Sequence, residues 1–282
     1  MSEMTLAQAV ETFAATTAAL PDEALEREWQ WRAHDEEGVR FAFFVTYQEL
    51  RELAVLVATE RAARGPAQTL AQRILAQHHA AYRDLHGVLA GAGDALLDRE
   101  PAPGEWPLRT VLEHVVGTEH GFFAVVSHAL ERHRRGEPLE RTPRDAIFTY
   151  HPEIAFDGTL AQILARYDEL HAKILRQFAD LDEGDLAANS LWWEGYPVEL
   201  GFRLHRFDAH LRQHTIQVEK TLAGIGHRLT ESRRLLRLLY GALGEVEGAS
   251  IGAPDGAADR QREVASTIAA RATEIAGLVG AR

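Results

Sequence analysis

The sequence predicts an almost entirely α-helical protein. Ala, Leu, Glu, Arg and Gln dominate its 282 residues, apolar residues recur at three- and four-residue spacing over long stretches, and the alternating pattern of strands is scarce. Residues that end helices divide these stretches into segments. Helices are expected over residues 5–19, 42–63, 67–97, 107–135, 159–180, 197–224, 230–248 and 258–279.

Glycine and proline mark the breaks between these helices. Gly65 and Pro66 end the second helix, and the REPAPGEWP run at 99–107 separates the third helix from the fourth. Pro107 suits the first position of the fourth helix, where no backbone donor is required. The later breaks lie at 136–138, at Gly184, at 224–226 and at 252–256.

The third to sixth of these helices form one natural set. We expect residues 67–226 to fold as a four-helix bundle of the up-and-down type with long connections. Two helices precede this set and two follow it, and neither pair could bury its apolar face alone. Residues 1–66 and 227–282 are therefore expected to be accessory helices that pack together as a second, discontinuous helical layer.

Two connections are longer than a bundle requires and are rich in aromatic residues. They cover residues 136–158 and 182–197. Such loops often form lids or pocket walls, although capping a bundle end or meeting another subunit explains them equally well. The residues singled out in them are Phe148, Tyr150, His151, Trp192, Trp193 and Tyr196.

The composition excludes several kinds of protein. Without cysteine the chain has no thiolate metal site, so any metal must be bound by histidine, carboxylate or water. A formal net charge of −12 opposes binding to nucleic acid. A basic segment followed by an apolar core is missing from the N-terminus, and no run of 18 apolar residues occurs, so we expect a cytoplasmic protein with no membrane partner.

Two histidines share one face of the helix expected over 197–224. His210 and His214 are four residues apart and lie on the rim of an apolar stripe, whereas His205 points elsewhere. With 14 histidines in the chain, chance alone gives about 0.7 pairs at this spacing, so spacing by itself leaves a surface or packing role open. In the helix after Pro107, His114 lies at the edge of another apolar face, close to Gly117.

The segments GEWPLRTVLEHVVGTEH and HLRQHTIQVEKTL resemble those of the DinB-like superfamily, four-helix metalloproteins that include YfiT-type metal-dependent hydrolases and thiol-dependent transferases. The resemblance covers about residues 67–226. It implies that His114, His210 and His214 are three metal ligands. It also matches Trp106 to the aromatic residue before the second helix, Glu119 to the acidic residue after the first ligand and Gln217 to the residue after the last. Family members often pair, which implies a homodimer unless the flanking segments cover that surface.

The resemblance implies an enzyme that acts on a small-molecule substrate. Three neutral imidazoles leave Zn²⁺ or Ni²⁺ an open position for water or for a low-molecular-weight thiol, so the reaction is either hydrolysis or thiol S-transfer. A metal-anchored binding protein without catalysis, or a stress-related helical protein, is the alternative. The residues expected to bind substrate are Trp192, Trp193, Tyr196, Arg203, Arg206 and Gln217.

The remaining polar residues receive simpler interpretations. Arg203 and Arg206 could hold an anionic group of a thiol, with a solvated arginine paired to a nearby acid as the alternative. Glu113 and Glu119 are candidates for supporting a metal ligand or transferring a proton. Helical phase places both away from the direction of His114, however, so a surface role is expected for each. The remaining histidines are expected to be mostly exposed: His78, His79, His86, His120, His128, His133, His171 and His227.

Overall fold

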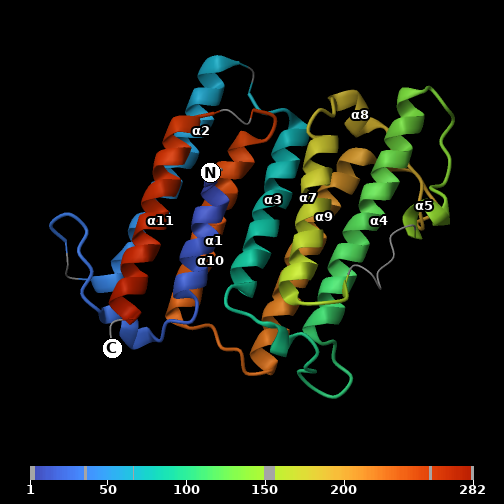
Figure 1. Cartoon of the computed structure of the whole chain (residues 1–282). Coiled ribbons are helices and arrows are strands. Elements are labelled where there is room, and N and C mark those ends of the chain that lie inside the picture. Colours follow the sequence, from blue (N-terminus) through green and yellow to red (C-terminus); the bar gives the residue numbers. More distant parts are fainter. Residues whose placement is uncertain (1–3, 35–36, 66, 149–155, 254–255, 281–282) are drawn as a thin grey trace. The chain divides into compact units, whose positions relative to one another are not determined.

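The computed structural model describes residues 4–34, 37–65, 67–148, 156–253 and 256–280, and it is built almost entirely of helices (Figure 1). The all-α prediction is confirmed. The long helices are α1 (Leu6–Thr17), α2 (Gly38–Arg64), α3 (Leu70–Leu89), α4 (Leu108–Arg134), α7 (Leu160–Phe178), α9 (Leu200–Gly224), α10 (Glu231–Ser250) and α11 (Ala258–Gly280).

Short elements fill the connections. The two strands pair antiparallel, with Asn189 opposite Glu199 and Ser190 opposite Val198. The short elements are the 3₁₀ turns η1 (Asp22–Glu26) and η2 (Asp94–Leu96), the helices α5 (Arg144–Phe148) and α8 (Glu183–Ala187), and the strands β1 (Asn189–Ser190) and β2 (Val198–Glu199). Of the aromatic residues singled out in the long loops, Tyr150 and His151 lie outside the described residues.

The third helix ends earlier than its pattern predicts. Helix α3 stops at Leu89 and not at residue 97. Gly91 adopts a left-handed φ of +75°, which a helix cannot continue through and which glycine accepts without steric cost. The 3₁₀ turn η2 follows. Pro107 stands at the N-cap of α4, one position before the helical position predicted for it.

The described residues fall into two compact units. The flanking unit consists of Met1–Ala67, Tyr82–Ala92 and His227–Arg282, and the central unit of Gln68–Ala81 and Gly93–Gly226. Helix α3 contributes its first part to the central unit and its last part to the flanking unit.

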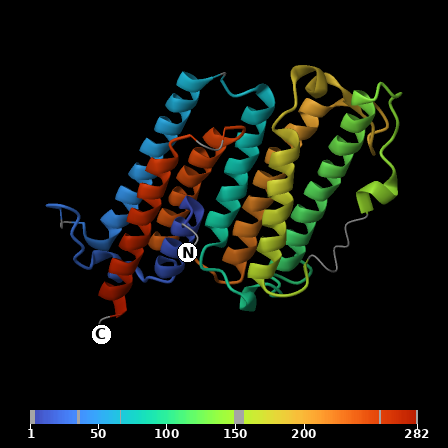
Figure 2. The same ribbon diagram turned by 45° about the horizontal axis from the view of Figure 1, so that its top comes forward.

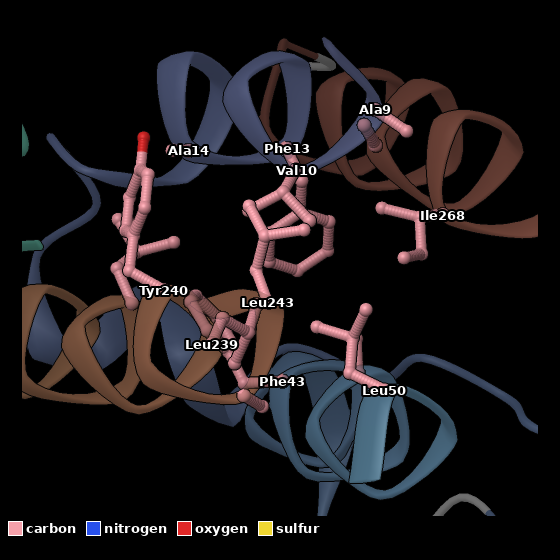
Figure 3. Close-up of a cluster of buried hydrophobic side chains, with 14 of the residues drawn as sticks. Ala9, Val10, Phe13, Ala14, Phe43, Leu50, Leu239, Tyr240, Leu243 and Ile268 are labelled. Carbon is pink, nitrogen blue, oxygen red and sulfur yellow. The ribbon is translucent and has the colours of Figure 1, made fainter. Parts of the chain in front are cut away.

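In the flanking unit, α1, α2, α10 and α11 pack around one apolar core (Figure 2). Phe13 and Phe43 meet edge to face at 5.0 Å between ring centroids, and Leu243 of α10 lies with them in the core (Figure 3). The last part of α3 joins this unit through ion pairs: the Arg83 guanidinium donates to both Glu247 carboxylate oxygens, at 2.6 and 2.7 Å.

The central unit contains α4, α7, α9 and the first part of α3, which run side by side (Figures 1 and 2). Helices α4 and α9 pack closely against each other. The apolar stripe predicted on α9 is buried throughout, which confirms the predicted helical phase of that segment. Its members are Leu200, Leu204, Phe207, Leu211, Val218 and Leu222.

Candidate metal centre

The contact between α4 and α9 brings together the three histidines predicted as ligands. His210 and His214 stand one turn apart on α9, with ring centroids 4.3 Å apart. His114 on α4 faces both of them, at 5.1 Å from the ring of His210 and 4.5 Å from that of His214. His210 and His214 are buried and His114 is half-buried. This three-histidine cluster lies entirely within the central unit.

The spacing of the nitrogen atoms suits a shared cation. His210 Nε2 lies 3.2 Å from His114 Nε2, and one nitrogen of each imidazole lies within 4.8 Å of the other two. Two imidazole nitrogens bound at tetrahedral angles to a zinc ion are about 3.3 Å apart, from the usual zinc–nitrogen bond length. His114 and His210 therefore have the spacing that a shared divalent cation requires, and a nitrogen of His214 lies close enough to join them.

Gln217 sets the tautomer of one of these imidazoles. His214 Nδ1 lies 2.7 Å from Gln217 Oε1. An amide oxygen only accepts hydrogen bonds, so Nδ1 carries the proton and donates it. The lone pair of His214 is thereby left on Nε2, which makes that nitrogen the one available to a metal, and outer residues commonly orient metal ligands in this way.

The environment of His114 and His210 disfavours their protonation. Burial, together with His214, His114 and Arg206, lowers the pKa of His210 to about 3. Burial and then His214 lower the pKa of His114 below its ordinary value. Both imidazoles are therefore unprotonated at neutral pH, which is the form that binds a metal.

One side of the cluster opens on a groove of about 460 Å³. His214 and Gln217 form part of its wall, and Trp106, whose ring centroid lies 5.4 Å from that of His114, forms another part. Lys220 and Glu105 bring one positive and one negative side chain to the same groove, hereafter the ligand groove. Other residues that line it are Pro101, Gly104, Thr221 and Gly224.

Most of the residues predicted to bind substrate lie elsewhere in the unit. Trp193, Tyr196, Arg203 and Arg206 line a second groove of about 550 Å³, hereafter the aromatic groove. Phe122 lies between this groove and the three-histidine cluster, since it lines the groove and its ring lies 5.7 Å from the ring of His210. The structure thus places Gln217 beside the three-histidine cluster and these four residues at a neighbouring surface.

The two arginines of the aromatic groove differ. Arg203 is only 1% exposed, and its guanidinium pairs with both carboxylate oxygens of Glu194 and donates to Ser190 Oγ at 3.0 Å. The expected acidic partner is present, but the expected solvation is wrong for Arg203, because its side chain is buried. Arg206 is exposed and lies over the Phe122 ring at 5.8 Å. Trp192, half-buried, packs edge to face on the same ring at 5.9 Å.

The prediction that Glu119 lies at the surface is wrong. Its side chain is fully buried, and Tyr167 on α7 donates a hydrogen bond to Glu119 Oε1 at 2.8 Å. The position points away from His114, as predicted, but α7 covers that side of α4. Glu113 is exposed, as expected.

Three of the histidines expected to be exposed are also buried. His78, His79 and His171 are 0%, 6% and 2% exposed. Apolar neighbours at helical spacing, such as Leu75 and Tyr82 around His78, were a signal in the sequence for this burial. Of the others, only His133 is exposed; His86, His120, His128 and His227 are half-buried.

Comparison with known families places most of the central unit in one of them. The sequence model of the DinB superfamily matches residues 77–218, which include all three histidines of the cluster. Comparison with curated proteins and with solved structures found no match to this chain. Among the described residues, every helix is too short or too polar to cross a membrane. Family and histidine groups together fit a metal-binding protein.

Proposed function

The chain belongs to the DinB superfamily, and from that premise we propose that it is a metal-dependent enzyme acting on a small molecule. The observation that carries the proposal is the group of His114, His210 and His214 beside the ligand groove, with two Nε2 atoms 3.2 Å apart. In the proposal these imidazoles hold Zn²⁺ or Ni²⁺, the divalent cations that suit nitrogen ligands. When bound, such a cation lowers the pKa of a coordinated water or thiol toward neutrality.

The residues around the cluster favour a thiol as the nucleophile. Low-molecular-weight thiols carry ionised groups, and Lys220 and Glu105 offer opposite charges to them in the ligand groove. Since the chain has no cysteine, a thiol nucleophile must enter as a cosubstrate. Trp106 gives the same groove an apolar wall, which limits the access of water to the reacting atoms. The proposed reaction is thiol S-transfer, with hydrolysis as the second candidate.

The aromatic groove is proposed as the binding place of the electrophilic substrate. Trp193 and Tyr196 are exposed there and offer flat apolar surfaces. Arg206 supplies a positive charge for an anionic group, whereas Arg203 is held by Glu194 and shapes the wall. Phe122 separates this groove from His210, so its ring would set how closely the substrate approaches the metal ligands.

Turnover measurements test this proposal. Zinc- or nickel-loaded wild type is assayed with a panel of thiols and electrophiles, and with model esters without thiol. We expect metal-dependent conjugation that is lost in His114→Ala and retained in His205→Ala, a control at an exposed position on α9. Ester turnover without thiol would assign hydrolysis instead. Tight binding of a small molecule with no turnover under either condition would overturn the enzyme proposal in favour of a metal-anchored binding protein.

A further inference from the structure

A second group of buried polar side chains lies inside the central unit. His78 on α3, Glu119 on α4 and His171 on α7 are each at most 2% exposed. One ligand atom of each side chain lies within 4.8 Å of the other two. Three helices therefore bring two imidazoles and one carboxyl group to a single point, hereafter the buried triad.

The distances within the buried triad match those of atoms that share a cation. His78 Nε2 lies 3.1 Å from His171 Nδ1 and 3.5 Å from Glu119 Oε2. Nitrogen and oxygen ligands bound at tetrahedral angles to a zinc ion are about 3.3–3.5 Å apart, from the usual bond lengths. The first of these distances also resembles the 3.2 Å between His210 and His114.

Two polar atoms of the buried triad lack a hydrogen-bond partner among the described residues. They are Glu119 Oε2 and His78 Nδ1, and both are buried. Buried polar atoms are nearly always paired, so an orphaned carboxyl oxygen that points toward two imidazoles needs an explanation. A cation between the three side chains would take up Glu119 Oε2 and offset the charge of the carboxylate.

Neighbouring side chains hold the triad in a ligating orientation. Tyr167 donates to Glu119 Oε1 at 2.8 Å, which leaves Oε2 directed at His78. His171 Nε2 forms a hydrogen bond with His79 Nδ1 at 2.9 Å, which leaves the other ring nitrogen of His171, Nδ1, directed at His78. Outer hydrogen bonds of this kind commonly orient carboxylate and imidazole ligands.

Two aromatic rings separate the buried triad from the three-histidine cluster. The Phe207 ring lies 5.2 Å from that of His78 and 5.4 Å from that of Phe122, which in turn lies 5.7 Å from that of His210. The two groups of ligands are therefore separate sites in one helical unit.

We propose that His78, Glu119 and His171 form a second divalent-cation site, with a structural role. Two imidazoles and one carboxylate are a donor set that binds zinc and similar transition metals. Because all three side chains are closed to solvent, the ion would act by joining α3, α4 and α7, and its binding would add to folding stability. The site goes beyond the proposed function, which needs only the three-histidine cluster.

Zinc stoichiometry tests the proposal. Protein stripped with a chelator is reloaded with Zn²⁺, desalted and analysed for zinc per chain by mass spectrometry. We expect two zinc ions in wild type and in the His205→Ala control, one in Glu119→Gln and one in the His210→Ala/His214→Ala variant. Equal zinc in folded Glu119→Gln and wild type would overturn the second site. Zinc lost from Glu119→Gln but not from the double variant would support it while contradicting the three-histidine site.

If Glu119→Gln does not fold, thermal unfolding of a variant in which the buried triad is unchanged still tests the proposal. In the His210→Ala/His214→Ala variant, added Zn²⁺ is expected to raise the thermal midpoint by several degrees, and excess chelator to reverse the shift. One zinc per chain in that variant together with the shift supports the site. Neither zinc nor a shift overturns it.

Discussion

The orientation of the His214 ring depends on the side-chain amide of Gln217. Gln217 Oε1 accepts a hydrogen bond from His214 Nδ1 at 2.7 Å, and this contact directs His214 Nε2 into the cluster. Loss of an outer partner of this kind commonly lowers metal affinity by about 10- to 100-fold. We expect Gln217→Ala to weaken zinc binding at the three-histidine cluster by that factor in competition with a chromogenic chelator. Gln213→Ala, at an exposed position on the same helix, is the control; equal affinities in the two variants would contradict this role.

The ion pair of Glu194 with Arg203 controls stability at the aromatic groove. Removing one partner of a buried pair costs about 3–5 kcal/mol, because the other charge is left uncompensated. Glu194→Gln should therefore lower the free energy of unfolding by about that amount at pH 7, as measured by urea denaturation. The exposed Glu199→Gln serves as control, and a loss no larger than that of the control would show that Arg203 finds another partner.

The same pair gives a pH dependence with a defined sign. Hydrogen bonding from Arg203 is the main cause that lowers the pKa of Glu194 in the folded protein. Because the pKa of Glu194 is lower in the folded protein, its carboxylate contributes fully to the free energy of unfolding when the pH is above the unfolded-state pKa of about 4.3. That contribution is lost as the pH falls through the folded-state pKa. Wild type should accordingly lose more stability than Glu194→Gln between pH 5 and pH 3; parallel losses would contradict this assignment.

At the scale of single elements, helix α4 contains a glycine with no evident structural task. Among the described residues, a β-carbon at Gly117 would meet no atom within 4 Å apart from its chain neighbours and the backbone of its own helix, whereas one at Gly121 would touch Trp192 at 3.6 Å. Alanine is favoured over glycine inside a helix by about 0.5–1 kcal/mol. We expect Gly117→Ala to raise the free energy of unfolding by that amount with unchanged zinc content. A loss of stability on chemical denaturation would show that the position packs more tightly than its surroundings suggest.

The long helices could be predicted to within a few residues because periodicity and terminating residues act locally. The short elements could not be predicted in this way. Helices α5 and α8 and the β1–β2 pair have too few residues to show a hydrophobic period, and they depend on contacts with residues distant in the sequence. Helix α3 was overextended because apolar spacing continues past Leu89, while the left-handed Gly91 ends the helix.

The same contrast applies to the sites. His210 and His214 lie on one helix, so their spacing revealed them, and the family resemblance added His114. The buried triad was missed because helical phase describes one helix at a time. Glu119 points away from His114 and was therefore assigned to solvent, although α7 lies on that side and supplies Tyr167 and His171. Only the packing of neighbouring helices brings those residues together.

At the scale of the whole molecule, segments far apart in the sequence share the core of the flanking unit. Leu243 of α10 is fully buried in the core that α1 and α2 also form (Figure 3). A buried leucine replaced by alanine costs about 2–5 kcal/mol, from transfer and cavity terms. We expect Leu243→Ala to lower the free energy of unfolding by that amount in urea denaturation. Leu238→Ala, on an exposed face of the same helix, should change it far less; similar losses would contradict the assignment of this core.

His114, His210 and His214 are proposed to bind a divalent metal. The most direct test is elemental analysis of purified, untagged protein, with wild type beside the His210→Ala/His214→Ala variant and His205→Ala as control. We expect the double variant to contain one zinc or nickel ion fewer per chain than wild type, and the control to contain as many as wild type. Equal metal contents in wild type and double variant, both folded by circular dichroism and both offered Zn²⁺ and Ni²⁺, would contradict it.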